Sequence, residues 1–264
     1  MNLHTCLLTN NDCYIKGRTT VPKGVMVHST AVNNPWLRRY VGPDDGLLGV
    51  NRNNNHWNMP GVGACVHAFI GKLADGSVAT YQTLPWTMRG WHCGTGTSGI
   101  SANNTHISFE ICEDGLGDAG YFNAVYREAV ELTAMLCREY GLDPLADGVV
   151  ICHAEGYKLG IASNHADVLH WFHKFGKSMD DFRADVARTM EGDNEMDEQA
   201  IRRIVREELS RLEAERADLP TSYTGKTLDL YREALSKGLM DGYRPQSYAT
   251  RQEVALMVNR AVRE

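Results

Sequence analysis

The stretch "DGVVICHAEG", residues 147–156, is an apolar β-type run that ends at His153 and opens onto a polar segment. The run "KGVMVHST", residues 23–30, has the same form and ends at His28. Val and Ile favour strands, and the change to polar residues marks a strand end. Side chains at strand ends face the surface clefts in which sites are usually built. The two runs therefore predict strands that each present a histidine at such a cleft.

Further strand patterns lie between these two runs. Residues 63–71 and 76–84 are apolar and flank Asp75-Gly76, a pair that favours a hairpin. In "HISFEIC", residues 106–112, strand side chains alternate between faces, so that Glu110 lies on the face opposite the apolar residues. An acid in the middle of such a strand lies either on a solvent face or in a functional pocket.

A helix is predicted from about Asn123, a good N-cap, to Gly141, a good C-terminal stop. Its expected buried stripe is Val125, Ala129, Leu132 and Leu136. Strands with interspersed helices predict an α/β domain built on one central sheet.

The composition narrows the functional classes. The chain has 264 residues, 43% of them hydrophobic and 23% charged, as in an ordinary globular protein. A net charge of -6 argues against a nucleic-acid-binding protein, which usually carries a basic face. We expect no membrane insertion, because no apolar run of transmembrane length occurs. The first residues lack the basic and apolar regions of a signal peptide.

The seven cysteines are odd in number and never form a C-x-x-C pair. This spacing excludes a zinc site built from cysteines alone and predicts mostly reduced, buried thiols.

The chain becomes highly charged near Gly192. The charged segment has one narrow helical stripe of apolar side chains, at Ile201, Val205, Leu209 and Leu212. Residues 223–264 read as a helix, a glycine-containing turn and a second helix, too short to bury a core alone. We therefore expect a domain at 1–190, a charged linker helix at 191–222 and a small helical appendage at 223–264. A homodimer through residues 196–264 would cover the apolar stripe.

The histidines at the strand ends suggest a metal site. Either His28 or His153 alone is compatible with a structural role, but "SNHADVLHW", residues 163–171, adds nearby donors. Catalytic zinc sites commonly use two histidines and a third donor and leave one position for water. Asp167 is a candidate third donor, with His165 two residues away. A zinc hydrolase also needs a carboxylate that takes a proton from water, which Glu110 would supply.

Four motifs occur in an order that resembles the type-2 N-acetylmuramoyl-L-alanine amidases. They are "GVMVHST", "GWHCG", "NNTHISFEIC" and "CHAEG" with "SNHADVLHWF", and the resemblance covers roughly residues 10–180. These zinc enzymes include phage endolysins, bacterial autolysins and peptidoglycan recognition proteins. The resemblance implies a central mixed sheet flanked by helices, with peptidoglycan as the substrate.

The resemblance also implies residue roles. His28 and His153 match the zinc histidines, Glu110 matches the catalytic glutamate, and Asp167 and His165 match the third ligand and the oxyanion helper. Val168 stands where Pro is common, and the interval from His153 to Asp167 is long. His165 and His170 therefore stay open as alternative ligands.

The remaining candidates have simpler interpretations. His92, in "GWHCG", matches a residue near the family's substrate groove and is expected to be a groove or structural residue. We expect His56 and His67 to be structural or surface residues, and Met135 and Phe182 to lie in the core. The segment "ALSKGLMDGYRPQSYATRQEVALMVNRAV" loosely resembles one S-layer-homology-type motif, a kind of repeat that attaches proteins to cell-wall polymers.

The resemblance predicts a zinc amidase that cuts between N-acetylmuramic acid and L-alanine, as an endolysin or autolysin. Such an enzyme would be made in the cytoplasm and act on the wall after release. Two alternatives stay open: a peptidoglycan-binding module that has lost catalysis, and an amidase for soluble muropeptides in cell-wall recycling.

Overall fold

The computed structural model describes residues 1–217, 229, 232–234 and 236–238. The chain divides into two compact units, residues 1–193 and 194–264. Among the described helices, none has the length and hydrophobicity that a bilayer crossing needs.

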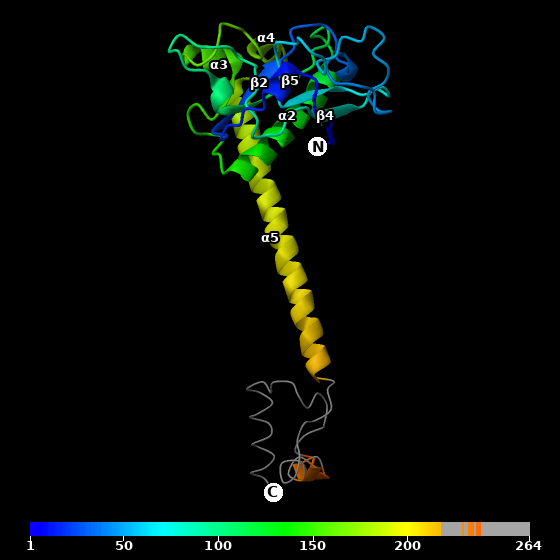
Figure 1. Cartoon of the computed structure of the whole chain (residues 1–264). Helices are drawn as coiled ribbons and strands as arrows, with labels where there is room; N and C mark the ends of the chain where they lie inside the picture. The colour runs from blue at the N-terminus through cyan, green and yellow to red at the C-terminus, as the bar shows by residue number, and fades with distance from the viewer. Residues whose placement is uncertain (218–228, 230–231, 235, 239–264) are drawn as a thin grey trace. The chain divides into compact units, whose positions relative to one another are not determined.

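The first unit contains a six-stranded sheet in the order β1-β4-β3-β5-β2-β6 (Figure 1). The strands are β1 (Leu3–Thr5), β2 (Gly24–Ser29), β3 (Ala68–Lys72), β4 (Val78–Gln82), β5 (His106–Ile111) and β6 (Val150–Cys152). Strands β3, β5, β2 and β6 run parallel to one another, while β3 and β4 form an antiparallel hairpin. The predicted mixed sheet and the hairpin at Asp75-Gly76 are both confirmed.

Helices flank this sheet (Figure 1). The α-helices are α1 (Asp12–Lys16), α2 (Ala119–Tyr140), α3 (His153–Lys158), α4 (Leu169–Phe172) and α5 (Met179–Ala217). Three short 3-10 helices are η1 (Leu37–Arg39), η2 (Ala102–Asn104) and η3 (His173–Phe175).

Helix α2 begins earlier than the sequence pattern predicts. Its N-cap is Asp118, whose side chain accepts a hydrogen bond from the backbone N–H of Tyr121 at 3.0 Å. The predicted start at Asn123 is therefore wrong, because an aspartate five residues upstream satisfies the free N–H groups of the first turn. The predicted end is correct: Gly141 has φ of 63°, a left-handed conformation that glycine adopts at little cost.

The two faces of the sheet are covered differently. On one face, Val25, Val27, Ile107 and Phe109 pack with α2, whose predicted stripe is buried, and with aromatic residues such as Phe182. On the other face, Met26 and Ile151 pack against Ala102 and Ala162, which belong to the connecting segments. Because strand side chains alternate, His28 and Glu110 lie on this second face, where loops rather than a long helix cover the sheet.

The cysteines do not fully match the prediction of reduced thiols. Cys13 and Cys65 form a disulfide across 52 residues of sequence, whereas Cys6, Cys93, Cys112, Cys137 and Cys152 are free. This pair forms because a tertiary contact brings the two segments together, which the spacing of the cysteines does not reveal. The side-chain amide of Asn11 donates to the carbonyl oxygens of Trp57 and Ala64, at 3.0 and 3.1 Å, and so holds α1 against the segment that carries Cys65.

The charged segment is helical, as predicted, but α5 already begins at Met179. Val205 and Leu209 of the apolar stripe are 50% and 56% exposed. The stripe therefore has no partner among the described residues at these two positions. The predicted appendage at 223–264 and its S-layer-like segment lie almost entirely outside the described residues, and the three-part domain division stays a prediction.

Candidate active site

The carboxyl ends of three parallel strands bring the predicted residues together. In the β2–β5 register, His28 lies opposite Glu110. In the β2–β6 register, Val27 lies opposite Cys152, the residue before His153. Opposite residues of neighbouring strands point to the same face of a sheet. The sheet thus places His28 between Glu110 and His153 along one edge.

His28, His153 and Asp167 form a cluster of potential ligands. Each offers one atom, and these atoms all lie within 4.8 Å of one another. His28 Nδ1 is 3.0 Å from Asp167 Oδ2 and 3.1 Å from His153 Nδ1, while His153 Nδ1 is 3.6 Å from Asp167 Oδ1. Both histidines are buried, with exposed fractions of 1% and 4%.

Asp167 reaches the cluster because its own backbone and the residues that follow it are anchored. The backbone N–H of Ala154 in α3 donates to the carbonyl oxygen of Asp167 at 3.3 Å. The next residue, Val168, is fully buried, and Trp171 and Phe172 of α4 lie in the main core. Burial of these apolar side chains fixes α4 against the sheet, and with it the position of the Asp167 carboxylate.

The protonation states of the cluster suit a cation. Burial lowers the pKa of His28, although the Asp167 carboxylate opposes this effect. Burial would raise the pKa of Asp167, but hydrogen bonds with His153 and His28 outweigh it and bring the pKa below its usual range. A neutral imidazole beside an ionised carboxylate is the state in which these groups bind metals.

The donor separations also fit a metal. A tetrahedral zinc site holds nitrogen and oxygen ligands about 2.0–2.1 Å from the ion, which places neighbouring ligands about 3.3 Å apart. The separations of 3.0, 3.1 and 3.6 Å bracket that value. Two imidazole nitrogens and one carboxylate group thus converge at spacings suited to one small cation.

The other ring nitrogen of each histidine is also engaged. His28 Nε2 is 2.9 Å from Nδ1 of His92, and His153 Nε2 is 3.3 Å from Oγ of Ser163. The Ser163 hydroxyl donates to the carbonyl oxygen of Cys93 at 3.0 Å, so it accepts from the His153 N–H. Such outer contacts fix the tautomer and leave Nδ1 facing the cluster.

Glu110 has the environment of a proton-transfer group. Its Oε2 is buried and has no hydrogen-bond partner among the residues that the structure describes. Burial raises the pKa of Glu110 well above its usual range, and the nearby negative charges of Asp167 and Glu113 add to this effect. A carboxylate with a raised pKa can both accept and return a proton near neutral pH.

Comparison with known protein families identifies the family of this chain. Residues 18–168, more than half of the chain, match the family model of the N-acetylmuramoyl-L-alanine amidases. The chain belongs to this family. It is therefore a peptidoglycan amidase, as the four motifs predict. No curated protein matches the chain.

Several solved structures resemble this amidase. The Staphylococcus aureus hydrolase AmiA in complex with its ligand is 21% identical over 72% of this chain and 82% of that chain, with a TM-score of 0.47. A mutant endolysin from Bacillus subtilis is 23% identical over 70% of this chain and 99% of that chain, with a TM-score of 0.46. PlyL is 19% identical over 70% of this chain and 96% of that chain, with a TM-score of 0.47.

The two alternative ligands of the amidase lie in different places. His165 is exposed, and its ring centroid lies 4.7 Å from that of His153, beside the cluster. His170 instead pairs with Glu113, its Nε2 lying 2.9 Å from Oε1. The grouping of potential ligands in the described residues contains Asp167 and neither of these histidines.

The remaining predicted residues have structural surroundings. His67 is fully buried and bonds to backbone groups, whereas His56 is half-buried. Phe182 is fully buried, and Met135 packs at the edge of the main core. His92, predicted to be a groove or structural residue, contacts His28 directly through its Nδ1.

Two residues of the amidase site are not predicted from the sequence. Ser163 orients His153, and Glu113 joins His170 to the loop after β2 by accepting from the Ala31 backbone N–H at 3.2 Å. Ser163 lies in a polar loop with no pattern that marks it. Glu113 follows the strand "HISFEIC" directly, and its position just beyond a strand end is the only signal in the sequence.

Proposed function

We propose that the amidase is zinc-dependent, with His28, His153 and Asp167 as the protein ligands. The observation that carries this proposal is the convergence of the three side chains. The Nδ1 atoms of His28 and His153 lie 3.1 Å apart, and each lies 3.0 or 3.6 Å from one oxygen of the Asp167 carboxylate. A zinc ion bound there would polarise the scissile carbonyl and lower the pKa of a bound water from 15.7 toward about 7.

Glu110 is the proton carrier in this proposal. It lies opposite His28 in the β2–β5 register, and one of its carboxylate oxygens is buried without a hydrogen-bond partner in the described part of the chain. Glu110 accepts a proton from the attacking water, and the water oxygen forms a bond to the carbonyl carbon. The proton then passes to the amide nitrogen as the C–N bond breaks. The products are a free carboxyl group on the lactyl side and the free amino group of L-alanine.

His165 has the supporting role that we propose for the oxyanion. Its ring lies beside that of His153, and its exposure leaves an N–H group free to point at a substrate carbonyl oxygen. A donor aimed at the negative charge that develops on this oxygen stabilises the transition state.

We also propose that the enzyme acts as an endolysin or autolysin, on the bacterial wall after release from the cytoplasm. The substrate supports this role, because intact peptidoglycan is an insoluble polymer outside the membrane. The rival functions make different demands. A binding-only module has no use for a complete ligand set with Glu110 beside it, and a recycling enzyme would prefer soluble muropeptides over whole sacculi.

The test combines metal analysis with product analysis. Purified protein should contain one zinc ion per chain. Mass spectrometry of digested sacculi should show stem peptides with a free N-terminal L-alanine and glycan chains without peptide. Metal-free protein that releases the same products would refute zinc dependence. Protein that binds sacculi without releasing peptides would support the binding module, and cleavage confined to soluble muropeptides would support the recycling enzyme.

A further inference from the structure

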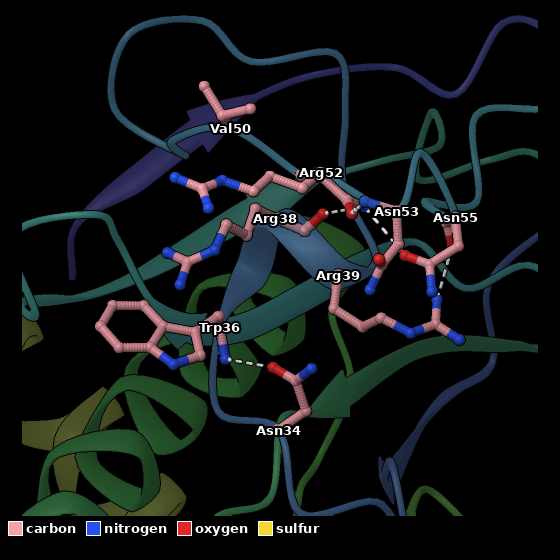
Figure 2. Close-up of a pocket in the computed structure, with 9 residues that line it drawn as sticks. Asn34, Trp36, Arg38, Arg39, Val50, Arg52, Asn53 and Asn55 are labelled. Carbon is pink, nitrogen blue, oxygen red and sulfur yellow. Dashed lines mark hydrogen bonds between the residues drawn. The ribbon is translucent and has the colours of Figure 1, made fainter.

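A polar cavity of about 440 Å³ is lined by residues outside the ligand cluster (Figure 2). Its lining residues come from two short segments, residues 34–39 and 50–55. They are Asn34, Trp36, Arg38, Arg39, Val50, Asn51, Arg52, Asn53 and Asn55. The lining contains three arginines and no carboxylate, so the cavity is positively charged.

Of the three arginines, Arg38 and Arg52 have guanidinium groups that are available to bind a ligand. Figure 2 shows their guanidinium groups extending in the same direction from the two segments. Within the described part of the chain, no ion pair involves either side chain. Arg39 differs, because it donates to the carbonyl oxygen of Asn55 at 2.6 Å and points the other way (Figure 2). Two neighbouring cations without a carboxylate favour an anionic ligand between them.

The walls of this cavity are held in place before any ligand binds. The Arg38 guanidinium carbon lies 4.1 Å from the centroid of the Trp36 ring, a cation–π contact that orients the side chain. The side-chain amide of Asn51 donates to the Arg38 carbonyl oxygen at 2.8 Å. This bond joins the two segments and keeps Arg52 close to Arg38. A preorganised site loses less entropy on binding.

The cavity belongs to the same edge of the sheet as the proposed zinc ligands. The backbone N–H of Asn34 donates to the carbonyl oxygen of Glu113, just beyond β5, and that of Lys72, at the end of β3, donates to Pro35. The cavity wall therefore crosses the carboxyl ends of β5 and β3, while His28 is the next-to-last residue of β2. Adjacent strands are about 4.8 Å apart, so β3 lies roughly 10 Å from β2.

We propose that Arg38 and Arg52 bind a carboxylate of the stem peptide, at a position beyond the L-alanine at the cleaved bond. This inference rests on the proposed function and adds a substrate-recognition site to it. An extended peptide spans about 3.4 Å per residue, so the second to fourth stem residues reach about 10 Å from the scissile amide. The planar guanidinium fork matches a carboxylate, and Trp36 offers an apolar surface to the adjoining side chain.

The experiment compares two soluble muramoyl peptides that differ at one group, a free stem-peptide carboxylate or its amide. The variants are Arg52→Gln, which alters an exposed side chain, and Arg38→Gln/Arg52→Gln. For the double variant we expect about a tenfold higher KM with the carboxylate substrate, the loss of a charge-assisted contact, and little change with the amide. Arg127→Gln, an exposed arginine on α2, is the charge-matched control and should behave as wild type.

The outcomes separate this inference from the function on which it rests. Wild-type protein that cleaves neither peptide would refute the amidase assignment for soluble fragments, whatever the arginine variants do. An active wild type with equal KM values for the double variant and the wild type would overturn the carboxylate site alone. If the double variant loses binding to polyglycerol phosphate but keeps the KM values of the wild type, the carboxylate site is overturned and the ligand is a phosphate of a wall polymer. A rise in KM for Arg52→Gln alone, confined to the carboxylate substrate, supports the proposal without any change to the buried structure.

Discussion

Two buried histidines, His28 in β2 and His67 directly before β3, have opposite surroundings. The Nδ1 of His67 accepts from the Ser108 backbone N–H at 3.0 Å, and its Nε2 donates to the Met88 carbonyl oxygen at 2.7 Å. The backbone thus occupies both nitrogens of His67. The Nδ1 of His28 instead faces His153 and Asp167. Both histidines are buried. The candidate ligand differs because its Nδ1 faces side-chain groups that can bind a metal rather than the backbone.

The strongest way to break this comparison is to remove the histidines of the cluster. His28→Ala or His153→Ala should abolish zinc binding and reduce amidase activity to background, because two remaining ligands hold the metal poorly. Metal content and peptide release from sacculi measure both effects. His67→Gln is the matched buried control and should keep its zinc. Full zinc occupancy in the His153→Ala protein would remove that residue from the ligand set.

A second test separates proton transfer from metal binding. Glu110→Gln should retain zinc and substrate binding but slow turnover by about 10² to 10⁴, because the amide cannot accept a proton from water. The substitution keeps the shape of the side chain and replaces one carboxylate oxygen with an amide NH2 group. Turnover of a soluble muramoyl peptide with metal content as the control measures this. A near-wild-type rate would make Glu110 a structural residue.

The third test compares neighbours within one loop. Asp167→Ala should lower zinc content, because its carboxylate is 3.0 Å from His28 Nδ1. His165→Ala should keep the zinc and slow turnover by about 10², the usual effect of losing an oxyanion donor. Metal analysis and kcat on the same preparations distinguish the two roles. Exchanged phenotypes would mean that His165 is the ligand and that the loop has another arrangement around the metal.

The structural histidine gives a smaller, pH-dependent effect. Burial lowers the pKa of His67 to about 4, against about 6.5 in an unfolded chain. Below pH 6.5 the unfolded state takes up this proton first, so stability falls as the pH drops toward 4. The contribution of His67 should reach about 2 kcal/mol lost between pH 7 and pH 5.

Urea unfolding of wild type and His67→Gln at both pH values checks this contribution. The variant lacks the titrating group and should lose less stability on acidification than the wild type, even if it is less stable at pH 7. An equal loss in both proteins would assign the acid sensitivity to other buried groups, such as His106, whose pKa burial also lowers.

The difference between these two histidines shows which features the sequence pattern can predict and which it cannot. The strand pattern predicts where His28, Glu110 and His153 lie, because alternation and strand ends are local properties. It also predicts the hairpin and the buried stripe of α2. The same pattern cannot say that Ser108 and Met88 occupy the His67 nitrogens, because these bonds join segments 41 and 21 residues apart. The disulfide of Cys13 and the cavity at Arg38 likewise depend on contacts between distant segments.

The smallest expected effect on catalysis concerns the C-terminal region, the opposite case to the buried cluster. Val205 and Leu209 are 50% and 56% exposed, four residues apart on one helix. We propose that they pair with a second copy, which makes the full chain a dimer through residues 196–264. A chain ending after Glu191 retains the buried Val186 of α5 and all residues of the proposed site. It should be a monomer with kcat and KM for soluble muropeptides within about twofold of the full chain.

The intact wall should separate the two forms. A dimer presents two wall-contacting units, and linked units raise avidity for a polymeric surface without any new contact. The shortened chain should therefore bind sacculi more weakly, as measured by co-sedimentation, while light scattering reports its mass. The double variant Val205→Lys/Leu209→Lys is the matched control, because it keeps every residue but places charges on the apolar stripe. It should also be monomeric. A monomeric wild type would refute the dimer, whereas a dimer that survives both lysines would place the interface elsewhere in the C-terminal region. Equal wall binding by all three proteins would remove the wall-contact role of this region and leave the amidase domain as the sole wall-binding part.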